Sequence, residues 1–134
     1  MEYFIRPMER ADLEICGQIE QSAGDPWSLA QLTEELENQQ AGGASRLFVA
    51  LLPGQPVVGL AAWQLAAGEA SLYTLTVSPK ARRTGAGGAL LRESMEALRG
   101  EGAETAFLEV RASNAGAIAL YEPVSYTHLT LPTT

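Results

Sequence analysis

The chain has 134 residues, of which 46% are hydrophobic, enough for one domain with a single buried core. Its 9 basic and 16 acidic residues give a net charge of −7, which disfavours nucleic acid as a partner and suits a basic substrate, although acidity also serves solubility alone. One cysteine and one histidine exclude an intramolecular disulfide and a multi-cysteine metal site, and no apolar run approaches the roughly 18 residues of a membrane span. We therefore expect a cytoplasmic protein with no metal, no nucleic-acid partner and no membrane association.

The first part of the chain predicts a strand and two helices. Residues 2–6 are typical of a short strand that stops at Pro7, and residues 11–21 carry apolar side chains at near-helical spacing. Cys16 belongs to that spacing, so we interpret it as a core residue of the first helix rather than a nucleophile. Ser28 followed by Gln31 matches a capping box, which predicts a second helix over residues 29–38.

Three apolar runs in the middle of the chain predict a sheet. They cover residues 47–52, 57–65 and 70–77 and are joined by short turns, which is typical of an antiparallel meander. A helix over residues 88–98, a strand over residues 105–110 and a short helix over residues 114–122 are expected to follow. This order predicts one α/β (α+β) domain whose helices cover the faces of the sheet.

A basic, glycine-containing turn, RRTGAG at residues 82–87, joins the third run to the helix that follows. Backbone N–H groups and the positive end of the helix dipole converge there, so the turn suits an anion such as a phosphate or pyrophosphate. Arg82 and Arg83 add positive charge, while Gly85 and Gly87 leave the main chain accessible and permit backbone angles that a Cβ would penalise. The turn matches neither the P-loop nor the dinucleotide fingerprint. Glycines before a helix also arise for steric reasons, so the motif alone leaves both roles open.

Two polar residues near the end of the chain are candidates for acid–base chemistry. Glu109 lies in an otherwise apolar strand, where a carboxylate is costly to bury unless it is paired or useful. It suits either an ion pair with an arginine such as Arg111 or a general base with a raised pKa. Tyr121 suits either packing on its helix or a general acid. The residues by themselves leave these roles open.

Taken together, the motifs resemble the GNAT superfamily of acetyl-CoA-dependent N-acetyltransferases. The resemblance covers residues 2–122 and is carried, in order, by LTV at 75–77, RRTGAG at 82–87, LEVRASN at 108–114 and AIALYE at 117–122. The last two runs, with PWS at 26–28, are similar to the RimI-like group of the superfamily, which acetylates the N-terminal alanine of a ribosomal protein.

The resemblance implies a GNAT fold, with a mixed, mostly antiparallel sheet flanked by helices, and direct acetyl transfer without a covalent enzyme intermediate. It implies Glu109 as the general base that takes a proton from the incoming ammonium through water, and Tyr121 as the acid that protonates the departing thiolate. The main chain at Leu75, Thr76 and Val77 would pair with the pantetheine arm, and Asn114 would hydrogen-bond the same arm. The pyrophosphate would lie against the turn and the helix start formed by Arg82, Arg83, Thr84, Gly85, Ala86, Gly87 and Gly88.

The implied acceptor is a protein N-terminus, in particular that of a basic ribosomal protein, which an acidic surface near the acceptor groove would favour. Two alternatives stay open. In the first, the acceptor is a small-molecule amine. In the second, the chain binds acetyl-CoA without catalysing a transfer.

Residues 123–134 depart from the family pattern, which continues with a Gly-Phe-containing turn and two further strands. The run PVSYTHLTLPTT resembles the translation of a transposase adapter used in sequencing libraries, and a divergent natural terminus is the alternative. We therefore expect an acetyltransferase domain over residues 1–122, a non-native tail over residues 123–134 and a sheet that lacks its last two strands. Such a sheet would expose the edge of the strand at residues 105–110, so the chain as written is expected to be inactive or poorly folded.

Overall fold

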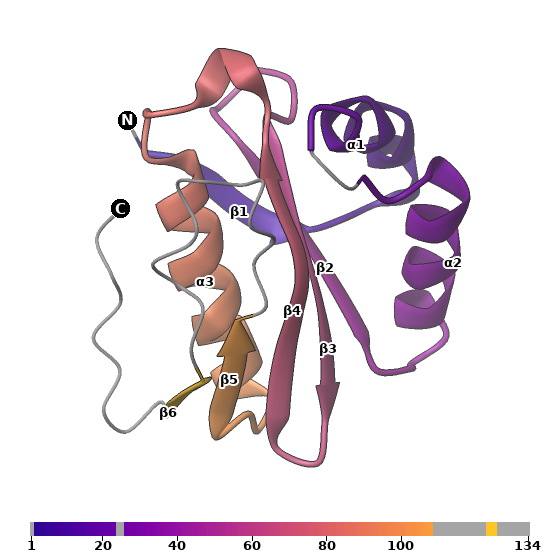
Figure 1. Cartoon of the computed structure of the whole chain (residues 1–134), viewed down its shortest axis with the longest axis vertical. Helices are drawn as coiled ribbons and strands as arrows, with labels where there is room; N and C mark the ends of the chain where they lie inside the picture. The colour runs from indigo at the N-terminus through magenta and orange to yellow at the C-terminus, as the bar shows by residue number, and fades with distance from the viewer. Residues whose placement is uncertain (1, 24–25, 109–122, 126–134) are drawn as a thin grey trace.

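The computed structural model describes residues 2–23, 26–108 and 123–125, which form one central sheet with helices on both faces (Figure 1). The strands are β1 (Phe4–Pro7), β2 (Ser45–Leu51), β3 (Gly59–Ala66), β4 (Glu69–Val77), β5 (Thr105–Leu108) and β6 (Pro123–Ser125). The α-helices are α1 (Leu13–Glu20), α2 (Leu29–Gln40) and α3 (Ala86–Gly100), and the single 3₁₀ turns are η1 (Arg10–Asp12) and η2 (Pro79–Ala81). The predicted helices of the first hundred residues are thereby confirmed, whereas the helix expected over residues 114–122 lies outside the described residues.

The strands lie in the sheet in chain order, from β1 at one edge to β6 at the other. Neighbouring strands are antiparallel except for β4 and β5, which run parallel. The meander β2–β3–β4 confirms the three predicted strands and their short connections. A mixed, mostly antiparallel sheet between helices also confirms the predicted fold class.

β6 is a strand at the edge of β5, where we expected none. It pairs antiparallel with β5, matching Thr105 with Ser125 and Phe107 with Pro123. The expectation of a free β5 edge was therefore wrong over this stretch, because the unpaired N–H and C=O groups of an edge strand readily accept another extended segment. The assignment of residues 123–134 to a non-native tail stays a prediction, and the DNA that encodes them tests it.

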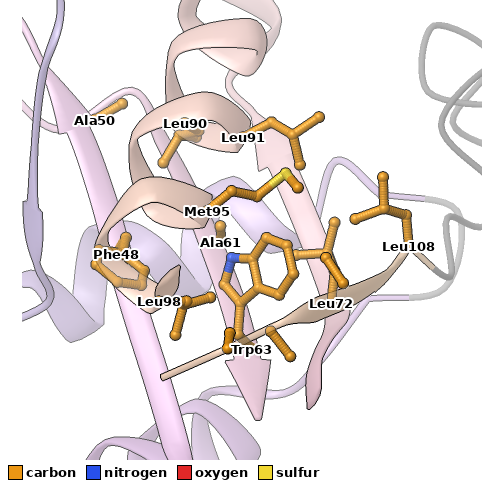
Figure 2. Close-up of a cluster of buried hydrophobic side chains, with 13 residues drawn as sticks. Phe48, Ala50, Ala61, Trp63, Leu72, Leu90, Leu91, Met95, Leu98 and Leu108 are labelled. Carbon is orange, nitrogen blue, oxygen red and sulfur yellow. The ribbon is translucent and has the colours of Figure 1, made fainter. Parts of the chain in front are cut away.

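On one face of the sheet, α3 buries an apolar stripe against the strands (Figure 2). The indole of Trp63 on β3 lies at the centre of this cluster, and its Nε1–H donates to the Ser94 hydroxyl of α3 at 3.0 Å, so the buried polar group is satisfied. Leu72 of β4 and Leu108 of β5 extend the cluster across the sheet. The residues that α3 contributes are Leu90, Leu91, Met95 and Leu98.

α1 and α2 cover the opposite face with a second apolar cluster. Leu32 and Leu36, one turn apart on α2, pack with Cys16 of α1 over the meander strands. The predicted capping box starts α2, since the amide of Gln31 donates to the Ser28 hydroxyl and the Gln31 side chain accepts from the Ser28 amide. Both faces of the central strands are therefore buried, which leaves the strand ends and the loops to build a site.

A two-fold hydrogen bond between Arg6 and Asp12 fixes the entry of the chain into α1. The two guanidinium nitrogens of Arg6 donate to the two carboxylate oxygens at 2.7 and 3.0 Å, and the Glu9 amide adds a third bond at 2.8 Å. Burial opposes the charge on Asp12, but these donors outweigh it and hold the pKa of Asp12 below its ordinary value of 3.8.

Arg6→Gln is expected to lower the free energy of unfolding at pH 7 by about 1 to 2 kcal/mol, because it removes the charged donors from Asp12. Since folding lowers the pKa of Asp12, this stabilisation is present above pH 4 and is lost as the pH falls through the folded pKa, below 3.8. Urea unfolding of both proteins across pH 3 to 7 measures the difference. Arg10→Gln, which breaks only an exposed 3.8 Å pair with Glu37, is the matched control and should change little.

Cys16 is confirmed as a core residue, with no side-chain surface exposed to solvent. Burial raises the pKa of its thiol to about 12, so the reactive thiolate is scarce at neutral pH. We expect a thiol reagent at pH 8 to label the folded protein at least about 100-fold more slowly than the urea-unfolded protein, since labelling requires opening of the core. Equal rates in the two states would contradict this placement.

Candidate active site

The end of β4 and the start of α3 meet where the strand ends, and from there α3 turns back along the strands (Figure 1). Leu75, Thr76 and Val77 are the last residues of β4, and the side chain of Thr76 is buried. After η2 and a tight turn, the first bond of the helical ladder runs from the Ala89 amide to the Gly85 carbonyl at 3.0 Å. The amides of Ala86, Gly87 and Gly88 precede that bond, so the helix itself offers them no acceptor. Their N–H groups and the helix dipole therefore suit an anion beside the end of β4.

The turn before α3 is built from two residues with left-handed backbone. Gly85 is the N-cap with φ 92°, so the glycine is required by conformation, as expected. Arg83 also has a positive φ, of 62°, a conformation that costs a residue with a Cβ free energy. The hydroxyl of Thr84 donates to the Ala81 carbonyl and so accepts from the Tyr3 hydroxyl at 2.7 Å, which ties the turn to the start of the chain.

Gly87 does not have the role in backbone conformation that we expected. It lies in the first turn of α3 with ordinary helical geometry, and a Cβ there would stand 3.6 Å from Val77 Cγ2, an ordinary van der Waals contact. That part of the prediction was wrong, because a glycine needs no special φ once the helix has begun. The role that remains for Gly87 is to leave the main chain at the helix start accessible to a ligand.

The two arginines of the turn differ in what they contact. Both are exposed, but Arg82 donates from Nε to the Val77 carbonyl at 3.3 Å and from Nη2 to the Ser22 hydroxyl at 3.4 Å. Arg82 therefore links the end of β4 to the segment after α1. Both arginines carry positive charge in the turn that leads into α3.

β4 contains a bulge at Tyr73. Ala62 pairs with Thr74 and Trp63 with Leu72, so Tyr73 is the extra residue. Before the bulge, Leu72 packs in the α3 core; after it, Leu75 packs there and Thr74 points to the other face, toward α1. Even-numbered residues of β4 therefore face α3 before the bulge, and odd-numbered residues face it after the bulge.

A hollow lies beside Tyr73 on the α2 side of the sheet. The ring centroids of Tyr73 and Trp27 are 6.5 Å apart at one wall of this hollow. Glu35 accepts hydrogen bonds from Ser45 and Gln64 beside it, while Glu34 is exposed. The hollow has a volume of about 340 Å³ and is lined by Trp27, Gln31, Glu34, Glu35, Gln64 and Tyr73. Its aromatic and acidic lining suits a cationic or amine-bearing group.

Glu20 at the end of α1 is a buried carboxyl group that the sequence reasoning missed. Its Oε1 accepts from the hydroxyls of Thr74 at 2.8 Å and Thr76 at 2.5 Å, and its Oε2 accepts from the Trp27 amide at 2.7 Å. A signal was present, since Glu20 follows Leu13 by seven residues and so falls on the buried face of the helix.

The remaining predicted site residues, Glu109, Asn114 and Tyr121, lie outside the described residues. Leu108, which precedes Glu109 in the sequence, pairs with Leu72 at the last position of the parallel β4–β5 ladder. Within residues 2–23, 26–108 and 123–125, no three His, Cys, Asp or Glu side chains are grouped to hold a metal ion. No helix in the same ranges is both long and apolar enough to cross a membrane.

The chain belongs to the acetyltransferase (GNAT) family, whose model matches residues 13–126. The predicted class, an acetyl-CoA-dependent N-acetyltransferase, is therefore confirmed. The chain is 37% identical over 128 residues to the [ribosomal protein bS18]-alanine N-acetyltransferase of Escherichia coli K12, across 95% of this chain and 82% of that protein. The resemblance to the RimI-like group is thereby confirmed.

Solved structures support the same assignment. The crystal structure of the ribosomal-protein-S18-alanine N-acetyltransferase from Escherichia coli matches with a TM-score of 0.74 at 35% identity, over 89% of this chain and 74% of that one. The PaiA N-acetyltransferase from Thermoplasma acidophilum, solved in complex with coenzyme A, shares the fold with a TM-score of 0.76 at 19% identity, over 90% of this chain and 86% of that one.

Proposed function

We propose that this protein transfers the acetyl group of acetyl-CoA to the N-terminal amine of a protein in the cytoplasm, and that its acceptor is a basic ribosomal protein beginning with alanine. One observation carries the proposal: the end of β4 lies beside the first amides of α3, which have no acceptor within the helix. This arrangement occurs in a chain that is 37% identical to a ribosomal protein alanine N-acetyltransferase. The acidic hollow beside Tyr73 suits a basic acceptor.

In the proposed complex the pyrophosphate of acetyl-CoA lies at the start of α3. The amides of Arg83, Thr84, Gly85, Ala86, Gly87 and Gly88 would donate to it, and Arg82 and Arg83 would add positive charge. The pantetheine arm would pair with the main chain of Leu75, Thr76 and Val77, and Asn114 would hydrogen-bond the same arm. Because these are largely backbone interactions, they depend on the course of the chain more than on side-chain identity.

The proposed chemistry is one direct transfer. Glu109 takes a proton from the acceptor ammonium through water, and the free amine attacks the thioester carbonyl carbon. A C–N bond forms as the C–S bond breaks, and Tyr121 gives its proton to the leaving thiolate. The nitrogen loses its second excess proton as the amide forms, and this proton restores the Tyr121 hydroxyl through solvent. The products are the acetylated N-terminus and coenzyme A.

A panel of acceptors tests this proposal. Ala-initiated basic peptides, polyamines and aminoglycosides are each incubated with acetyl-CoA, and thiol release and acetylated product are measured. The proposal expects the highest kcat/KM with the basic peptides. Preference for a polyamine or an aminoglycoside would contradict it in favour of a small-molecule acceptor, and calorimetric binding of acetyl-CoA without any turnover would identify a non-catalytic chain.

A further inference from the structure

Glu20 joins three parts of the molecule that belong to different elements. Its carboxyl group is fully buried at the end of α1, yet all three of its hydrogen bonds leave the helix. Two reach β4, at Thr74 and Thr76, and one reaches the main chain at Trp27, beyond the break that follows α1. A buried carboxylate that accepts three hydrogen bonds is satisfied, so its burial costs little free energy. The loss of one of these donors would make its burial costly.

The two threonines are on this side of β4 only because of the bulge. If β4 alternated regularly through Tyr73 instead of bulging there, Thr74 and Thr76 would share the face of Leu72 and point toward the apolar α3 core. The Glu20 contacts therefore favour the bulged register over the regular one. The same register exposes Tyr73 and brings its ring near that of Trp27.

Trp27 depends on Glu20 in a different way. Its amide donates to Oε2 of Glu20 at 2.7 Å, and this bond anchors the segment that leads into α2. Glu20 thus holds both aromatic residues of this wall: Trp27 directly through its amide, and Tyr73 through the neighbouring Thr74. Through Thr76 it also holds the part of β4 assigned to the pantetheine arm.

We propose that Glu20 is a positioning residue for acetyl transfer, which fixes the Trp27–Tyr73 wall of the acceptor hollow relative to the cofactor strand. The proposal rests on the proposed function, because it takes the hollow as the acceptor site. Glu20 touches no reacting atom in this role. It acts through β4 and through the backbone at Trp27.

Three variants separate this role from a purely structural one. Glu20→Ala removes all three bonds. Glu20→Gln conserves them in part: its amide oxygen can accept from Trp27, and its NH₂ group can donate to the threonine hydroxyls, which rotate to accept. Thr74→Val removes one of the three bonds to Glu20, together with the long 3.4 Å contact between the Thr74 and Thr76 hydroxyls, at nearly constant volume. It serves if Glu20→Ala does not fold. Glu14→Ala, at an exposed position of the same helix, is the matched control.

Two readouts are measured below the unfolding temperature of each variant. Steady-state kinetics with an Ala-initiated basic peptide give KM for peptide and for acetyl-CoA. Acrylamide quenching of tryptophan fluorescence reports on Trp27, since the only other tryptophan, Trp63, is 1% exposed. For Glu20→Ala we expect the KM for peptide to rise roughly tenfold, because the loss of Glu20 leaves buried donors without an acceptor and loosens the wall of the hollow. We also expect acrylamide to quench the fluorescence of Trp27 more strongly. Acetyl-CoA KM should change less, Thr74→Val should shift both readouts in the same direction, and Glu20→Gln should restore most of the wild-type values.

A variant at Glu20 or Thr74 that unfolds at a lower temperature but keeps wild-type peptide KM and quenching would overturn the proposal and leave Glu20 a structural role alone. If the wild-type protein acetylates no peptide, the proposed function fails instead. The quenching of the variants then still decides whether Glu20 holds Trp27.

Discussion

Glu109→Gln is expected to lower kcat for acetyl transfer by about 10² to 10⁴, the usual contribution of a positioned general base. The amide has almost the shape of the carboxylate but cannot take the proton from the acceptor ammonium. KM for acetyl-CoA should stay near its wild-type value, because the cofactor is assigned to β4, Asn114 and the start of α3. Thiol release under saturating peptide and acetyl-CoA measures the effect.

The matched control for this prediction is Glu104→Gln, which removes a charge at an exposed position just before β5. It should leave kcat within a factor of about two, since surface charges contribute little. If Glu109→Gln lowers the free energy of unfolding while kcat is maintained, the residue has the structural role, an ion pair with an arginine such as Arg111, and not the role of base.

Gly85→Ala is expected to raise KM for acetyl-CoA about tenfold, since a Cβ at φ 92° costs roughly 1 to 2 kcal/mol and 1.4 kcal/mol is a factor of ten. No atom lies within 4 Å of the new Cβ, so the cost comes from the backbone and not from a clash within the protein. The turn can escape this cost only by leaving the conformation that directs the amides of α3 at the anion site. Acetyl-CoA titration by calorimetry checks the loss.

Gly100→Ala provides the control for Gly85→Ala. Its Cβ would also meet no atom within 4 Å, but Gly100 is the last residue of α3 and has no positive φ. Alanine there should raise the unfolding temperature slightly and leave acetyl-CoA binding unchanged. Equal affinity of the two variants would show that the conformation of Gly85 does not matter for the cofactor.

The elements of the fold could be predicted because each depends on local signals. The meander follows from apolar runs between turn residues, and α2 follows from the Ser28–Gln31 cap. The turn at residues 82–85 and the start of α3 could be predicted for the same reason, since they are adjacent in the sequence. β6 was missed because residues 123–125 have no strand signal beyond their own alternation, and the pairing depends on the free edge of β5.

The interior of the site depends on contacts that no local pattern contains. Thr74 and Thr76 are 54 and 56 residues from Glu20, and their hydrogen bonds exist only once α1 lies on the sheet. The bulge did have a signal in the sequence, because the apolar residues that pack in the α3 core are at even positions up to Leu72 and at odd positions from Leu75 onward. The left-handed backbone of Arg83 has no such signal, because this conformation is disfavoured for arginine and is held only by the surrounding structure.

The bulge at Tyr73 also marks the one place where this strand can change its length during evolution. Deleting Tyr73 would bring the pairs Trp63–Leu72 and Ala62–Thr74 into direct succession, so regular alternation would keep Leu75 toward α3 and Thr74 and Thr76 toward Glu20. Such a deletion would remove an exposed ring and leave both buried faces of the strand intact. A one-residue deletion away from the bulge would instead turn one part of β4 over and expose or bury the wrong side chains on both faces. A change in the length of β4 should therefore be tolerated at Tyr73 and penalised elsewhere in the strand.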